Sequence, residues 1–154
     1  MSISKELKMK RPLESFRHEA LLNIVRTASC LEKIAQSFFA QFDMTEAQYN
    51  ILIVLKIEGR SLTQIELGER VVSSRPNVTV LLDRLEGKGY VERRRVENDR
   101  RIYQVHLTKK GSKAVDKAEK AYVEKVEMLM AVLNQSECQG ISMALEKLRK
   151  SFQK

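Results

Sequence analysis

The chain has 154 residues, a formal net charge of +8 and a pI near 9.6. This length suits one domain, or one domain with an added helical scaffold, and no uncharged apolar run approaches the roughly 18–20 residues of a membrane span. The lysine-rich residues 1–11 do not have the form of a secretory signal. We therefore expect a cytoplasmic protein with no membrane partner.

A long amphipathic helix is expected first. It begins near Pro12, which suits a first turn, and hydrophobic residues then recur from Phe16 to Phe42 at spacings of three or four. Asp43 and Met44 end the pattern. A stripe of this length exceeds what one small core can cover, so it predicts packing against a second chain.

Two capping boxes predict the next two helices. Thr45 with Gln48 opens a strongly apolar helix that ends at Gly59, and Thr63 with Glu66 opens a short helix. The extended pair at 61–62 separates the two helices.

A third helix is expected to follow after a tight turn. Ser73 and Ser74 are its predicted caps, Pro76 is tolerated in its first turn, and the glycines at 87 and 89 end it. Its apolar residues recur at helical spacing, so one face is expected to pack on the core.

The pattern then changes to period two and back to helix. Residues 90–107 alternate about a turn at 97–99, which predicts a β-hairpin with a basic tip. Thr108 is expected to cap a long charged helix, and Ser136 with Glu137 to begin a last one.

Two capped helices joined by a tight turn and followed by a hairpin make a winged helix-turn-helix. The predicted fold class is therefore mainly α with a small β-hairpin wing. We expect residues 45–111 to form a DNA-binding lobe, and residues 1–44 and 112–154 to form helices for dimerisation. Residues 88–110 hold eight basic and three acidic residues, a net charge of +5 that indicates double-stranded DNA as the partner.

The start of the second helix of this motif carries side chains suited to reading bases. They are Ser74, Arg75, Asn77 and Thr79. Arginine can pair with guanine, asparagine with adenine, and threonine can form a hydrogen bond or contact a thymine methyl group. The alternative is that Ser74 is only the helix cap and Asn77 a solvated residue of the first turn.

The hairpin tip offers a second contact. Asp99, Arg100 and Arg101 form a basic finger that suits the minor groove, where Asp99 can orient Arg101 through a charge-assisted hydrogen bond. The arginines at 93–95 alternate sides of a strand, so not all of them can touch DNA. Three further residues are candidates for phosphate contacts: Thr63, Arg84 and Arg94.

From about Met44 to Gly111, and more weakly over the flanking helices, the sequence resembles the MarR family of bacterial regulators. The matching segments are MTEAQYNIL, LTQIELGERV, VTVLLDRLEGKGYVERR and ENDRRIYQVHLTKKG. The last is the most specific, because it joins the wing pattern D-x-R of Asp99 and Arg101 to the L-T-x-x-G strand exit.

The resemblance implies a homodimer that binds a pseudo-palindromic operator, usually represses, and releases DNA on binding a small molecule or on oxidation. The terminal helices would form the dimer interface. Val80 stands where many relatives carry arginine, so the operator sequence does not transfer from them. Gly68 replaces a usual alanine, at some cost in helix propensity.

The resemblance also indicates where a regulatory ligand would bind. The family's ligand site lies between the dimer helices and the winged lobe, where Phe38, Phe42 and Tyr49 could line it. Aromatic residues at this spacing equally form a core, and a regulator without an effector is a further alternative. Cys30 and Cys138 are expected to be small buried hydrophobes, and Cys30 has no adjacent arginine or histidine that would activate it, so redox sensing is not expected.

The alternatives to a specific regulator are an enzyme and a protein that binds DNA without sequence preference. An enzyme is not expected, because the sequence has no nucleophile elbow, no glycine-rich phosphate loop and no H-E-x-x-H. No cofactor is expected either, and the scattered cysteines and histidines do not suggest a metal. A protein that binds DNA without sequence preference would also fit the charge, and the ratio of operator to scrambled-DNA affinity separates the two.

Overall fold

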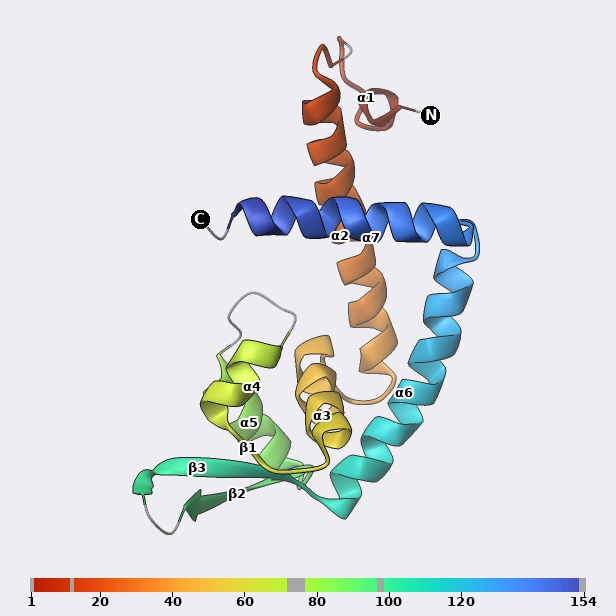
Figure 1. The fold of residues 1–154 in the computed structure, drawn as a ribbon. Coiled ribbons are helices and arrows are strands. Elements are labelled where there is room, and N and C mark those ends of the chain that lie inside the picture. The colour runs from red at the N-terminus through yellow and green to blue at the C-terminus, as the bar shows by residue number, and fades with distance from the viewer. Residues whose placement is uncertain (1, 12, 72–76, 97–98, 153–154) are drawn as a thin grey trace.

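The computed structural model describes residues 2–11, 13–71, 77–96 and 99–152. In chain order the elements are α1 (Ile3–Glu6), α2 (Phe16–Ala40), α3 (Glu46–Glu58), β1 (Leu62–Thr63), α4 (Gln64–Arg70), α5 (Val78–Gly87), β2 (Val91–Val96), β3 (Asp99–Leu107), α6 (Lys109–Met130) and α7 (Gln135–Ser151). Figure 1 shows α3, α4, α5 and the hairpin gathered in one lobe, from which α6 leads away to α7. The predicted fold class, mainly helical with a small hairpin, is confirmed.

The capping boxes predicted from the sequence are present. The Thr45 hydroxyl accepts from the backbone N–H of Gln48, and the Gln48 side chain accepts in return from the Thr45 backbone. Thr63 and Glu66 make the same reciprocal pair at the start of α4. Gly59 ends α3 in the left-handed conformation, with φ of 63°. These local signals fix where the first two helices of the lobe begin.

The predicted start of α2 differs from the observed one. Pro12 lies outside the described residues, and the helix begins at Phe16 after Ser15, whose hydroxyl accepts from the backbone N–H of His18. A serine cap supplies an acceptor for one of the unsatisfied N–H groups of the first turn, whereas proline only tolerates that position. Before it lies the short helix α1, which the hydrophobic periodicity did not predict.

The helix α5 starts later than the sequence predicted. Ser73, Ser74 and Pro76 lie outside the described residues, and the N-cap is Asn77, whose side-chain oxygen accepts from the backbone N–H of Val80 at 3.3 Å. Asparagine is as good a cap as serine, so three candidate caps competed within five residues. The prediction that Ser73 and Ser74 cap this helix is therefore wrong.

The start of α7 also differs from the predicted one, by two residues. Its cap is Asn134, which forms a full capping box with Glu137, so the predicted start at Ser136 is wrong. Thr108, in contrast, caps α6 as predicted by accepting from the backbone N–H of Gly111.

The sheet is a three-stranded antiparallel unit in the order β1-β3-β2. Val91 pairs with Leu107 and Arg93 with Val105, and the register shifts between Arg95 and Val96. Val105 also pairs with Leu62 of β1, so the short extended segment predicted before α4 closes the sheet.

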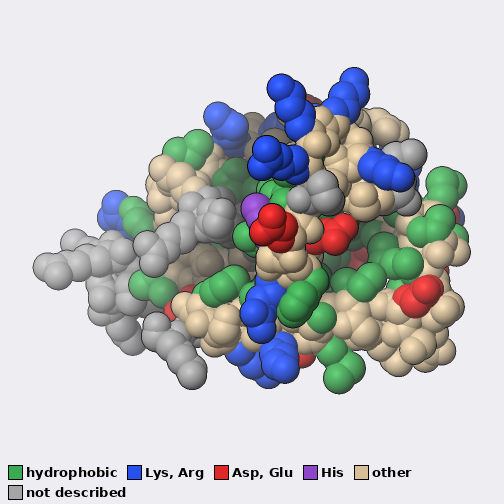
Figure 2. Space-filling model, turned by 90° about the horizontal axis from the view of Figure 1, so that it is seen from above, with side chains coloured by type: hydrophobic (Ala, Val, Ile, Leu, Met, Phe, Trp, Pro, Cys, Tyr) green, Lys and Arg blue, Asp and Glu red, His purple; other side chains and the backbone are tan. Residues whose placement is uncertain are grey.

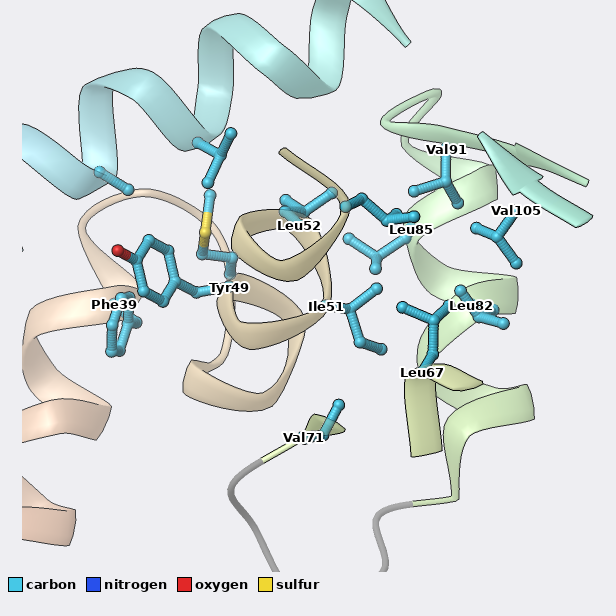
Figure 3. Close-up of a cluster of buried hydrophobic side chains, with 14 of the residues drawn as sticks. Phe39, Tyr49, Ile51, Leu52, Leu67, Val71, Leu82, Leu85, Val91 and Val105 are labelled. Carbon is cyan, nitrogen blue, oxygen red and sulfur yellow. The ribbon is translucent and has the colours of Figure 1, made fainter. Parts of the chain in front are cut away.

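The core of the lobe lies between α3, the two helices of the helix-turn-helix and the sheet, as Figure 3 shows. Fully buried side chains from all of these elements meet there: Ile51, Leu52, Leu67, Leu82, Leu85, Val91 and Val105. Burying one such side chain contributes about 1.5–3 kcal/mol, so this cluster sets the positions of α5 and the hairpin relative to each other.

An ion-pair cluster and an aromatic cluster join the lobe to the long helices. Lys56 of α3 lies 2.6 Å from Asp116 and 2.5 Å from Glu119, both on α6. Nearby, the Phe39 ring of α2 lies 4.8 Å from that of Tyr49 and 5.4 Å from that of Tyr122. The start of α6 is thus fixed to the lobe.

The far end of the molecule is different, because α7 has no buried residue. Large apolar side chains on the terminal helices face solvent in the single chain: Phe16, Leu21, Val25, Leu31, Ile141, Met143, Leu148 and Phe152. Figure 2, which views the molecule from this end, shows hydrophobic side chains interspersed with lysine and arginine. None of the described helices combines the length and apolar character that crossing a bilayer requires.

Candidate nucleic-acid interface

The helix α5 divides into a buried and an exposed side. Leu82 and Leu85 are fully buried, whereas Thr79, Val80 and Arg84 are exposed. The α4–α5 pair therefore has the form of a helix-turn-helix whose second helix presents its first turn to solvent. This is the geometry that places side chains at base edges in the major groove.

Asn77 lies at the start of this exposed turn, where its side chain can cap the helix and also donate hydrogen bonds outward. Its side-chain oxygen is used by the cap, as described above, while the amide NH₂ of the same side chain still has two donors. Ser74 and Arg75, which are also predicted to read bases, lie outside the described residues.

Thr79 is in contact with the first helix of the motif. The side-chain amide of Gln64 donates to its hydroxyl oxygen. Gln64 follows Thr63, whose hydroxyl is the cap of α4, so the phosphate-contact candidate Thr63 already accepts one hydrogen bond within the protein. Sequence reasoning missed Gln64, because helical periodicity shows which face a residue lies on but not which side chain it meets across a turn.

Hydrogen bonds in the capping box of α4 stabilise the ionised form of Glu66. The Glu66 carboxylate accepts from the Thr63 backbone N–H at 2.7 Å and from Arg60 at 2.9 Å. These hydrogen bonds to the charged form hold the pKa of Glu66 down to about 2. The Glu66 carboxylate therefore stays ionised, and α4 stays capped, across the physiological pH range.

Arg93 of β2 is a structural residue rather than a free DNA contact. Its guanidinium lies 2.6 Å from Asp83 and 2.6 Å from Glu86, both on α5, and its side chain is only 23% exposed. Its backbone N–H also donates to Glu86 at 3.0 Å, and Arg93 lowers the pKa of that carboxyl. The clamp made by Asp83, Glu86 and Arg93 joins the recognition helix to the wing.

The next two arginines point to different partners. Arg94, a candidate phosphate contact, makes two exposed hydrogen bonds to Glu92, at 3.0 and 2.9 Å. Arg95 lies with its guanidinium 5.8 Å from the Tyr103 ring centroid and donates to the Tyr103 hydroxyl at 3.2 Å. Alternation along the strand, as expected, separates the three side chains. Arg95 was not singled out from the sequence, although its exposure makes it a basic side chain of the wing.

Residues 42–102 match the model of the MarR family. This part of the chain is therefore similar to the winged-helix lobe of the MarR family. An uncharacterized HTH-type transcriptional regulator of Bacillus cereus is 30% identical over 97 residues, which cover 63% of this chain and 63% of that relative. The HTH-type transcriptional regulator PapX of Escherichia coli is 26% identical over 145 residues, or 93% of this chain and 88% of PapX.

A solved structure extends this similarity to the whole architecture. The crystal structure of the Staphylococcus aureus MepR–DNA complex aligns with a TM-score of 0.75 and 25% identity, over 90% of this chain and 99% of that one. The fold of the flanking helices is therefore shared with MepR, as well as that of the winged lobe.

The predicted wing contacts Asp99, Arg100 and Arg101 fall at the start of β3. Only their backbone course is described, and the turn at 97–98 lies outside the described residues. The strands β2 and β3 direct this end of the hairpin away from the core, on the lobe that also presents α5 (Figure 1).

The aromatic residues predicted to line an effector site contribute mainly to the core. Phe38 is 8% exposed and Tyr49 is 5% exposed, and burial raises the pKa of Tyr49 to about 12. Phe42 is partly buried against the same cluster, 5.2 Å from the Phe38 ring. Beside them, a cavity of about 560 Å³ lies between α2 and α6. Of the three predicted residues, only Phe38 lines it.

The cysteines differ from expectation. Cys30 is exposed in the single chain and Cys138 is half-buried, so the prediction that both are small buried hydrophobes is wrong. The reason is that this stretch of α2 faces solvent, and helical periodicity does not reveal whether a stripe has a partner in its own chain. Within the part of the chain that the structure describes, no three side chains of His, Cys, Asp or Glu converge as metal ligands.

Proposed function

We propose that this chain is a transcriptional regulator, a repressor that binds a pseudo-palindromic operator as a homodimer and responds to a small molecule. The observation that carries the proposal is the exposed first turn of α5 beside a hairpin segment with a net charge of +5. Its relatives are named HTH-type transcriptional regulators, and MepR has been crystallised with DNA.

The proposed contacts divide into base reading and backbone binding. Arg75, Asn77 and Thr79 read base edges, with Ser74 beside them, and Asn77 does so through the amide group that its cap leaves available. The proposed backbone and minor-groove contacts are Thr63, Arg84 and Arg94, together with Asp99, Arg100 and Arg101 of the wing. Arg94 would exchange Glu92 for a phosphate, which costs little because that ion pair is exposed.

The exposed apolar surface of the terminal helices supports the homodimer. The amphipathic helix α7 has no buried residue, so its apolar face has no counterpart among the described residues of the chain. Twofold symmetry would set two α5 helices about one DNA turn, roughly 34–36 Å, apart. Because the two subunits are related by this symmetry, the operator would be pseudo-palindromic.

The cavity between α2 and α6 supports a small-molecule effector. It is lined mainly by apolar side chains, with one partly buried phenol and a few charged groups: Ala28, Leu31, Glu32, Ile34, Ala35, Phe38, Glu46, Tyr122, Lys125, Val126, Leu129 and Met130. Such a lining suits a small apolar or aromatic molecule. Because α6 is also fixed to α3 through Lys56, an occupant that moves α6 would move the lobe with it.

The test is fluorescence anisotropy of the full chain with duplexes from upstream of its own gene and with a scrambled duplex, over a salt series. A specific regulator should prefer its operator by about 10³ or more, with two subunits per duplex. Equal, salt-sensitive affinity for every duplex would instead favour a protein that binds DNA without sequence preference.

A further inference from the structure

Gln64 and Thr79 connect the two helices of the helix-turn-helix through their side chains. Gln64 is the first residue of α4, and its amide donates to the Thr79 hydroxyl in the first turn of α5. Both ends are held by their own helix starts, one by the Thr63–Glu66 capping box and the other by the Asn77 cap. Two fixed backbones therefore bring these side chains together at the exposed edge of the motif.

We propose that Gln64 is a positioning residue for base recognition, which fixes the Thr79 hydroxyl as a hydrogen-bond donor toward the major groove. This inference rests on the proposed function, because it needs α5 to enter that groove. Nothing in the sequence pattern assigns such a role to Gln64, which lies on the helix that is not expected to read bases.

The Thr79 hydroxyl can act both as a donor and as an acceptor of hydrogen bonds. A hydroxyl has one donor and two acceptor lone pairs, so an exposed threonine can present either to a base. The hydrogen bond from Gln64 occupies one lone pair of the Thr79 hydroxyl oxygen, so that lone pair points toward α4. Because threonine is β-branched, its side chain also has few χ1 rotamers to choose from. The hydroxyl proton is then left to point away from α4, toward whatever α5 faces.

A fixed donor discriminates among bases. Guanine, adenine and thymine each offer an acceptor in the major groove, whereas cytosine offers only its N4 amino donor. The Gln64–Thr79 pair should therefore disfavour cytosine at the contacted position of each half-site. A threonine free to rotate would tolerate all four bases more evenly.

Stability alone does not explain the pair. The bond is exposed to solvent, where the net contribution of a hydrogen bond is small. The helices α4 and α5 are already joined by the fully buried Leu67, Leu82 and Leu85. The contact thus adds little to the packing of the lobe but fixes the orientation of an outward-facing hydroxyl.

The experiment compares Gln64→Ala, Thr79→Val and the double variant in the full chain. Affinities are measured on a set of duplexes in which each operator position is replaced, symmetrically in both half-sites, by the other three base pairs. We expect both single variants to lose about five- to tenfold of the discrimination against cytosine at the same position. The double variant should lose no more than Thr79→Val alone, because the two residues act as one unit.

Ile65→Ala is the matched control, since Ile65 is the next residue of α4 and is 76% exposed. It should leave the base profile unchanged, and melting curves verify that every variant folds. A Gln64→Ala profile identical to that of the parent would overturn the inference while leaving the regulator intact. Equal loss on all duplexes, including scrambled DNA, would also overturn it by indicating a phosphate contact. A parent without sequence preference would overturn this inference and the proposed function together.

Discussion

Gly111, in the first turn of α6, lies where no side chain can fit. A Cβ added there would lie 2.1 Å from the Tyr90 carbonyl oxygen and 2.9 Å from the Leu107 side chain. The same oxygen accepts the Thr108 backbone N–H, which joins the sheet to α6. We expect Gly111→Ala to lower the free energy of unfolding by at least about 2 kcal/mol, because either this backbone contact or the helix start must move. Urea unfolding followed by circular dichroism measures the change.

Gly68→Ala is the same substitution at a position with room for it. The nearest atom to an added Cβ is Val78 Cγ2 at 3.7 Å, an ordinary van der Waals distance, and Gly68 lies in the interior of α4. This variant should gain about 0.5–1 kcal/mol from helix propensity. If Gly111→Ala were as stable as Gly68→Ala, the close approach of α6 to Tyr90 would be wrong.

At the scale of elements, Arg93 links β2 to α5. Replacing it by glutamine removes the guanidinium that pairs with Asp83 and Glu86, so we expect Arg93→Gln to destabilise the protein by about 1–3 kcal/mol. It should also weaken operator binding, because the wing loses a fixed angle to the recognition helix. Arg94→Gln is the control for stability alone, since the exposed pair with Glu92 should contribute under about 1 kcal/mol and Arg94 is itself a proposed phosphate contact.

This clamp also predicts a dependence on pH. Arg93 lowers the pKa of Glu86 from its ordinary value of 4.5, so the stability it contributes is complete above that value and is lost as the pH falls through the lowered pKa. The difference in free energy of unfolding between the parent and Arg93→Gln should therefore shrink below about pH 4.5. A difference that stays constant into acid would show that the Arg93 contacts with the α5 carboxylates contribute nothing.

The same elements show what the sequence could and could not predict. The caps at Thr45 and Thr63 were predictable because a capping box is a local pattern of a few residues, and that at Thr108 because a threonine directly before a helical pattern is a local signal too. The start of α5 was not, because adjacent serines and an asparagine all satisfy the same rule. Contacts across elements, such as Gln64 with Thr79, depend on the tertiary packing of two helices, and no periodicity encodes them.

At the scale of the whole molecule, the apolar side chains of the terminal helices need a partner. Phe16 is 75% exposed and Phe152 is 73% exposed, and Ile141 and Leu148 lie two turns apart on one side of α7. Many large apolar side chains exposed together on the terminal helices are typical of a protein–protein interaction surface. The apolar side chains of the winged lobe, in contrast, are buried within the chain, in one core with the end of α2 and the first half of α6. A second copy of the chain is the partner that would cover both helices symmetrically.

We therefore expect the parent to sediment as a dimer, with a melting temperature that rises with protein concentration. Replacing both Ile141 and Leu148 by glutamate should shift the sedimentation coefficient to that of a monomer, because two charges would be buried without partners. The variant should keep the helical circular dichroism of its lobe but bind the operator more weakly, since it loses the second half-site. Lys147→Glu changes an exposed residue of α7 and should stay dimeric. A parent that is monomeric at concentrations where it saturates its operator would contradict the twofold arrangement and, with it, the need for a pseudo-palindromic site.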